Sequence, residues 1–306
     1  NYVPAAKDPM VYLVSHTWAN RFEKGRRRAT IEAYSNCDSV LLYNDLTNEK
    51  ATFLGRKKNN GVGTHFIWEN RDIRYNVLRA VGYYKGKPVA EDLIVFKGLE
   101  QAPNFELLYQ DDKKILKGEA GYNYLYRLNC GGDDYTDSFG QLWLQDNTNY
   151  SHSWAENFKD LNSYLASQRT TNDPIRGTRD WKLFQHFRFG RHQLEYRFPV
   201  ADGTYRIELY FTEPWHGTGG SASTDCEGLR IFDVAVNDSV VLDDLDIWAE
   251  SGHDGVCKKV VYATVTGGML RIHFPEVKAG QALISGIAIA SVEANLQPTL
   301  FPASDW

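Results

Sequence analysis

The chain has 306 residues, of which 42% are hydrophobic and 24% are charged, and its formal net charge at pH 7 is -5. This is the composition of a folded globular protein, and the length favours two domains over one. The charge excludes nucleic acid as a partner, because phosphate binding needs clustered Lys and Arg, and no apolar stretch approaches the roughly 20 residues that span a membrane.

The first hundred residues alternate short apolar runs with polar turns. Runs of this length, rich in β-branched and aromatic residues, are typical of β-strands. Gly86 and Pro88 mark a turn before the last of these runs. The predicted strands are 11–14, 28–34, 39–43, 65–68, 77–83 and 92–96. They predict an immunoglobulin-like β-sandwich over residues 1–100.

Residues 101–121 are predicted to be a linker. They contain Pro103, Gly118 and Gly121, with a cluster of Lys and Asp at 111–114. Breakers of this kind interrupt regular structure, and only the run at 105–109 is a candidate edge strand.

Strand patterns resume at residue 124. Between two groups of strands lies a long polar stretch at 146–180, and long ordered loops on a sandwich commonly carry binding residues. No helix of regular length is predicted. The runs lie at 124–130, 141–143, 182–189, 192–198, 203–211, 230–247, 260–265, 269–274 and 282–289. The fold class is therefore all-β, with a jelly-roll sandwich over 122–293 and a C-terminal tail at 294–306.

The four cysteines show neither C-x-x-C pairing nor accompanying His spacing, which argues against a zinc site. Cys226 and Cys257 precede the strands that begin near residues 230 and 260. If those strand entrances are adjacent, the Cα atoms would meet the roughly 4.4 to 6.8 Å window of a disulfide. We hypothesise a bridge between them.

Short motifs follow one another in a fixed order through the second domain. They are NCGG at 129–132, YTDS at 135–138, YRFPV at 196–200, GTY at 203–205, YFTE at 210–213, RIFDVAVN at 230–237, DLDI at 244–247 and GH at 252–253. In this order they resemble the malectin family of carbohydrate-binding β-sandwiches. The resemblance implies a domain that holds sugar and does not cut it.

The same resemblance implies where a sugar would bind. The aromatic pair of the family's pocket falls on Trp215 and His216, and a further pocket position falls near Phe189. Trp215 would stack on the C–H face of a pyranose, and His216 would offer a hydrogen bond. An acidic ligand residue of the family is missing before the last strand, where Lys278 and Gly280 stand, so the sugar preference stays open.

Neighbouring loops supply further candidates for this carbohydrate-binding site. Arg179, Asp180 and Arg188 offer hydrogen bonds to hydroxyl pairs, and Trp154 and Trp181 offer aromatic surface. A Trp taken alone is more often a covered core or interface residue. Packing therefore remains the alternative role of each tryptophan, Trp215 included.

The first domain carries a second resemblance. Residues 9–12, His16, Trp18, YSNCDSV at 34–40 and VGYYKGKPVA at 81–90 resemble the immunoglobulin-like C-terminal module of glycoside hydrolase family 2 enzymes, the β-galactosidase group of bacteria. The order of the two domains is similar to the C-terminal end of such an enzyme, whose catalytic glutamates lie on a barrel domain. The start at Asn1, without an initiator Met, favours a segment of a longer protein.

We therefore expect a non-catalytic accessory region of a periplasmic or secreted hydrolase, with oligo- or polysaccharide and the catalytic barrel of the same polypeptide as partners. Neighbouring acids such as Asp243 and Asp244 point to opposite faces of a strand, whereas a glycosidase holds two carboxylates about 5 to 10 Å apart across a cleft. No cofactor is expected, apart from a structural calcium at such acids. A spacer or dimerisation module and a free-standing lectin remain alternatives.

Overall fold

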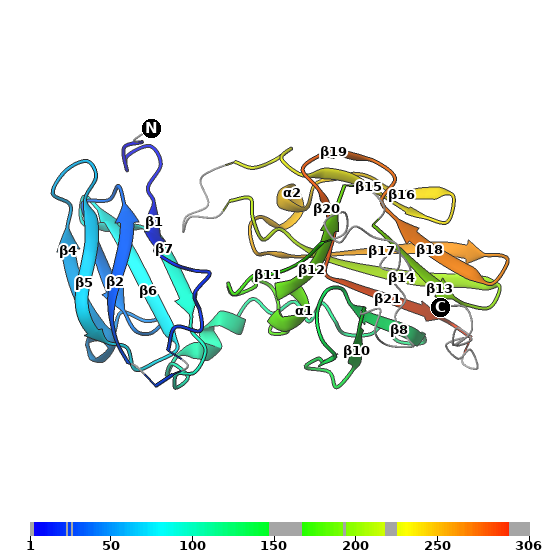
Figure 1. Cartoon of the computed structure of the whole chain (residues 1–306), viewed down its shortest axis with the longest axis horizontal. Coiled ribbons are helices and arrows are strands. Elements are labelled where there is room, and N and C mark those ends of the chain that lie inside the picture. The colour runs from blue at the N-terminus through cyan, green and yellow to red at the C-terminus, as the bar shows by residue number, and fades with distance from the viewer. Residues whose placement is uncertain are drawn as a thin grey trace. The chain divides into compact units, whose positions relative to one another are not determined.

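The computed structural model describes residues 3–22, 24–25, 27–146, 167–191, 194–217 and 225–293. It divides into two compact units. Unit 1 comprises Asn1–Gln110, Asn172–Pro174 and Gly217–Asp225, and unit 2 comprises Asp111–Thr171, Ile175–His216 and Cys226–Trp306. In both units β-strands are the main regular structure and almost all of them pair antiparallel, which confirms the all-β fold class (Figure 1). The predicted domain limits at residues 100 and 121 stay predictions.

Two sheets surround one core in the described part of unit 1. The strand order in the first sheet is β1 (Val11–Leu13), β2 (Arg28–Ser35) and β5 (His65–Asp72). In the second sheet it is β4 (Phe53–Lys58), β3 (Ser39–Tyr43), β6 (Val77–Tyr84) and β7 (Lys87–Val95). Alternate side chains such as Leu42, Trp68 and Ile94 are buried between them. The sequence did not indicate β4 because most of its side chains are exposed, so it lacks the apolar alternation of the other strands.

A charged histidine lies inside unit 1. The Nδ1 atom of His16 is 2.6 Å from a carboxylate oxygen of Asp173, and its Nε2 atom is 2.8 Å from one of Asp92, which is on β7. Burial lowers the pKa of His16, but the hydrogen bonds to the two aspartates outweigh it and raise this pKa to about 10. The imidazolium thus stabilises unit 1 at neutral pH.

The described residues of unit 2 form three sheets. The largest orders β17 (Val256–Val265), β14 (Gly203–Thr212), β21 (Gly286–Ser291), β8 (Asn123–Asn129), β10 (Leu142–Gln145) and β9 (Tyr135–Thr136). The second orders β13 (Glu195–Pro199), β18 (Met269–His273), β15 (Ile231–Val236) and β16 (Ser239–Leu245), with β19 (Val277–Ala279) beside β15. The third orders β11 (Ser167–Thr170), β12 (His186–Gly190) and β20 (Ala282–Ile284). One apolar core draws side chains from all three, among them Leu209, Phe232 and Leu283.

Short helices replace parts of two predicted strands and follow a third. The run at 182–189 begins with α1 (Trp181–Gln185), and α2 (Ile247–Ser251), whose N-terminus is capped by Asp246, begins where the run at 230–247 ends. The candidate edge strand at 105–109 is wrong, because Phe105–Tyr109 is a 3-10 helix. Apolar runs this short do not distinguish strand from helix. Within the described ranges, no helix has the length and apolar character of a membrane-spanning segment.

The predicted disulfide is not formed, since all four cysteines are buried thiols that are not joined to one another. The prediction assumed that the strands after Cys226 and Cys257 enter side by side. These strands are β15 and β17, and they belong to different sheets. Burial raises the pKa of Cys257 to about 11, so its thiol is protonated and unreactive at neutral pH.

We predict that His16 stabilises unit 1 at neutral pH and that this stabilisation is lost at alkaline pH. Because the pKa in the folded state is above the unfolded value of about 6.5, the stabilisation is complete below pH 6.5 and is lost as pH rises through about 10. Chemical denaturation should show a free energy of unfolding lower for His16→Gln than for the parent by on the order of 3 kcal/mol at pH 6, and a smaller difference at pH 10.5. A difference that stays constant across this range would contradict the assignment.

Candidate functional site

The end of β14 carries the charged group around which the candidate site is built. Glu213 follows this strand directly, and its side chain is 0% exposed. Its carboxylate accepts hydrogen bonds from the backbone N–H groups of Trp215, at 3.0 Å, and His216, at 3.1 Å. Pro214, which lies between Glu213 and Trp215 in the sequence, has no backbone N–H that needs a partner. The carboxylate therefore fixes a tight turn that presents Trp215 and His216.

Arg230 neutralises this carboxylate. It stands immediately before β15, is buried, and donates from Nε and Nη2 to the two carboxylate oxygens of Glu213. Its Nη1 atom donates to the backbone oxygen of Gln281. A buried charge costs several kcal/mol unless it is paired and hydrogen-bonded, so each member of this pair fixes the other.

The indole of Trp215 is held by three neighbours. The guanidinium carbon of Arg230 lies 5.0 Å from its ring centroid, in cation–π geometry. The rings of Phe187 and Phe189 pack edge to face at 5.5 and 5.0 Å between centroids. The residue nevertheless remains 36% exposed. The result is a fixed aromatic surface that is open to solvent.

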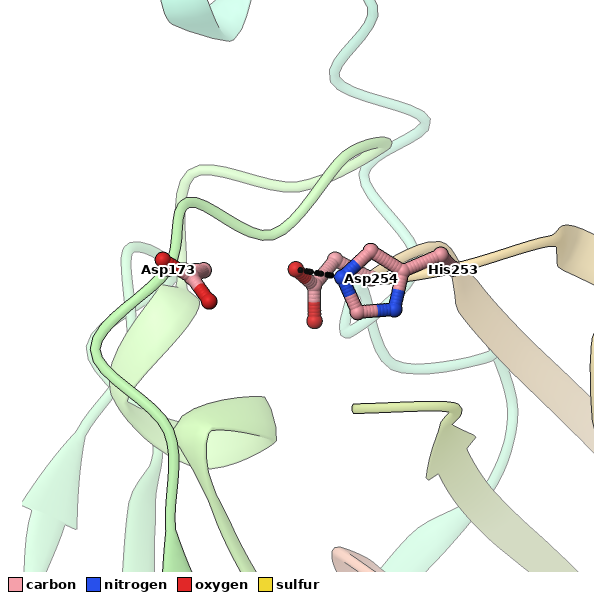
Figure 2. Close-up of side chains that lie close together, drawn as sticks. All are labelled: Asp173, His253 and Asp254. Carbon is pink, nitrogen blue, oxygen red and sulfur yellow. Dashed lines mark ion pairs between the residues drawn. The ribbon is translucent and has the colours of Figure 1, made fainter. Parts of the chain in front are cut away.

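The segment that contains His253 and Asp254 holds the residue after β14 in place. The backbone N–H of Asp254 donates to the carbonyl oxygen of Glu213 at 2.9 Å. His253 forms an ion pair with Asp254, Nε2 to Oδ2, at 3.0 Å (Figure 2). The guanidinium of Arg176 donates to the carbonyl oxygen of His253 at 2.7 Å. The Gly252-His253 motif seen in the sequence thus supports the turn that carries Trp215.

The structure brings together three of the predicted site residues. Trp215 and His216 occupy consecutive positions of the turn, and Phe189, on β12, contacts Trp215. Trp154 lies outside the described residues. Whether the three residues bind a ligand stays a proposal.

Two further candidates, Asp180 and Trp181, form hydrogen bonds that stabilise the start of α1 and the loop before it. Asp180 is buried and accepts hydrogen bonds from the hydroxyl groups of Tyr135, at 2.7 Å, and Ser138, at 2.8 Å. The indole N–H of Trp181 donates to the carbonyl oxygen of Thr178 at 2.9 Å. Both residues therefore have a structural role, and their part in binding stays a prediction.

The two predicted arginines pair with carboxylates. Arg179 lies 3.4 Å from Asp112. Arg188 donates to Asp146 from Nε at 3.0 Å and from Nη2 at 2.9 Å. Because side chains alternate along a strand, Arg188 lies on the face of β12 opposite to Phe187, which contacts Trp215. A contact of either arginine with a sugar stays a prediction.

Sequence reasoning missed Glu213, Arg230 and Phe187 as parts of the site. A signal was present, because Glu213 ends one apolar alternating run and Arg230 begins another. Charged residues at the ends of two buried strands are expected to pair when those ends meet.

One cluster of acids has the composition of a metal site. Oxygen atoms of Asp233, Asp243 and Asp244 all lie within 4.8 Å of one another. The expectation that Asp243 and Asp244 point to opposite faces of a strand is therefore wrong, because Asp244 has a φ of +52° and the pairing of β15 with β16 is irregular. The ammonium of Lys278 already contacts Asp244, and Asp233 accepts a hydrogen bond from the backbone of Asp244. A protein cation therefore balances part of this charge, and the structural calcium stays a prediction.

Unit 2 is thus a β-sandwich that presents a fixed aromatic surface at its strand ends. The sequence profile of the family described as "Malectin domain" matches residues 124–294, more than half of the chain. The chain belongs to the malectin domain family. The curated relative Malectin of Danio rerio is 24% identical over 166 residues, a match that covers 52% of this chain and 52% of the relative. The chain thus spans about half the length of that relative.

Solved structures show more distant similarity. Bacteroides uniformis beta-glucuronidase 2 is 24% identical, with 92% of this chain and 30% of that chain covered and a TM-score of 0.43. The plant receptor-like kinase FER is 14% identical, with coverages of 95% and 83% and a TM-score of 0.45. The ANX2 ectodomain of Arabidopsis thaliana is 13% identical, with coverages of 96% and 84% and a TM-score of 0.45. TM-scores below 0.5 support no conclusion about activity.

We predict that Glu213→Gln destabilises the protein strongly. The substitution leaves the Arg230 guanidinium buried without its counter-ion, which should lower the free energy of unfolding by about 3 to 5 kcal/mol. Urea denaturation followed by far-ultraviolet circular dichroism measures this loss. The matched control is Glu250→Gln, because Glu250 is half-exposed in its ion pair with Lys259 and should cost less than about 1 kcal/mol. Equal losses in the two variants would contradict the role of the buried pair.

Proposed function

We propose that unit 2 binds carbohydrate on the surface formed by Trp215, His216 and Phe189. The observation that carries this proposal is the indole of Trp215, which is exposed although Phe187, Phe189 and Arg230 fix its position. A ring that is already fixed loses little conformational entropy when a ligand stacks on it. An exposed and fixed aromatic surface suits a ligand that is flat and apolar on one face and polar at its edge.

A pyranose ring has this character. Its C–H face stacks on an indole, and its hydroxyl groups need hydrogen-bond partners at the rim. His216, which is adjacent to Trp215 and partly exposed, offers an imidazole for this purpose. Membership of the malectin domain family, among whose members the Danio rerio relative is named Malectin, supports the assignment.

In the wider protein, we propose that the chain is a non-catalytic accessory region of a β-galactosidase-like glycoside hydrolase that is periplasmic or secreted. Among the described residues, unit 1 has seven strands in sheets of three and four, which supports an immunoglobulin-like module that precedes the malectin domain in the sequence. The other partner would be the catalytic barrel of the same polypeptide. Tethering raises the effective concentration of substrate near that barrel, so that even a millimolar site is useful.

We predict that Trp215→Ala removes sugar binding and leaves the fold intact. Loss of a central stacking tryptophan should cost about 2 kcal/mol or more, roughly a thirtyfold loss of affinity. A glycan array with the parent chain identifies the tightest saccharide, and calorimetric titration then compares parent and variant. Trp18→Ala is the matched control, since Trp18 is an exposed tryptophan of unit 1 and its loss should leave affinity unchanged.

Two outcomes would contradict this proposal. One is a parent chain that binds no saccharide on the array, and the other is an unchanged affinity in Trp215→Ala. Sedimentation of the same variants tests the structural alternative, which predicts that Trp215→Ala dissociates an oligomer.

A further inference from the structure

An exposed arginine follows the strand that carries Phe189. Arg191 directly follows β12, two positions after Phe189, which contacts Trp215. Its side chain is exposed, and its Nε atom donates to the carbonyl oxygen of Gly280 at 3.0 Å. This hydrogen bond fixes one edge of the guanidinium plane.

The Gly280 carbonyl is itself held in place. Gly280 has a φ of +63°, and a Cβ atom there would lie 2.8 Å from the carbonyl oxygen of Leu229. Only glycine permits this close approach. The next carbonyl, that of Gln281, accepts from Arg230. Consecutive carbonyl groups thus hold two arginines, one buried against Trp215 and one at the surface.

The two arginines differ in their counter-ions. Glu213 neutralises Arg230. Among the residues that the structure describes, by contrast, no carboxylate pairs with Arg191, and no hydrogen bond occupies its Nη1 or Nη2 atom. With Nε occupied, the free edge of the guanidinium presents two parallel nitrogen donors. This edge matches a carboxylate or sulfate group, which accepts two hydrogen bonds side by side.

We propose that Arg191 makes the site selective for saccharides that carry an anionic oxygen group, a carboxylate or a sulfate, on or next to the ring that stacks on Trp215. This inference rests on the proposed carbohydrate-binding function and adds the ligand class. Within the described ranges, Arg230 is neutralised by Glu213, whereas Arg191 has no carboxylate partner. A neutral sugar would find the same stacking surface but no partner for the cation.

The test uses the whole chain and a panel of glucose and galactose disaccharides, each in neutral, uronic acid and 6-O-sulfated form. Calorimetric titration should give affinities about tenfold higher for at least one acidic form than for its neutral parent, as expected for a hydrogen-bonded charge pair. The uronic acid and sulfate arms identify which group is recognised. Added NaCl should weaken acidic binding alone.

Arg191→Gln should bring the preference for the acidic form below about twofold, with little change in neutral affinity. The matched control is Arg197→Gln, which removes the same charge from an arginine that pairs with Glu195 and should keep the preference. Thermal unfolding verifies that both variants are folded.

Three results would overturn the proposal. Neutral and acidic forms that bind the parent chain equally, or an acidic preference that survives in Arg191→Gln, would refute the role of Arg191 and leave carbohydrate binding standing. Failure of every saccharide in the panel and on the array to bind would refute both.

Discussion

The buried ion pair between Glu213 and Arg230 is the interaction on which the candidate site depends. The same carboxylate neutralises a guanidinium and accepts two backbone N–H groups of the turn that carries Trp215. The same guanidinium covers the indole. Because neither charge tolerates burial alone, the pair commits the end of β14 and the start of β15 to one geometry. A surface tryptophan thereby acquires the fixed position of a core residue.

This pair also joins elements that are distant in sequence. Glu213 follows a strand of the large sheet, Arg230 precedes a strand of the second sheet, and Gln281 precedes β20 of the third. The three sheets that the described part of unit 2 contains thus meet at one charged contact, which also holds Trp215. The tight turn at Gly280 extends the arrangement to Arg191, so that the fold sets both the stacking surface and the charge beside it.

The fold was largely predictable from the sequence, because alternation of apolar and polar residues marks strands that are buried on one face. Exposed β4 and the short helices α1 and α2 lacked that signal. Trp215, His216 and Phe189 were predicted through family resemblance. Glu213 and Arg230 were not, since a charged residue in a sequence is expected at the surface, and only the meeting of two strand ends explains their burial. The disulfide failed for the same kind of reason, because sequence proximity to strand starts does not tell which sheet a strand joins.

The most direct test of the central claim is a nuclear magnetic resonance titration that follows the indole N–H signals of the eight tryptophans. The signal of Trp215, assigned from its absence in Trp215→Phe, should shift saturably as the tightest-binding saccharide is added, and it should shift most. Saturable shifts confined to other tryptophans, with the Trp215 signal unmoved, would contradict the account.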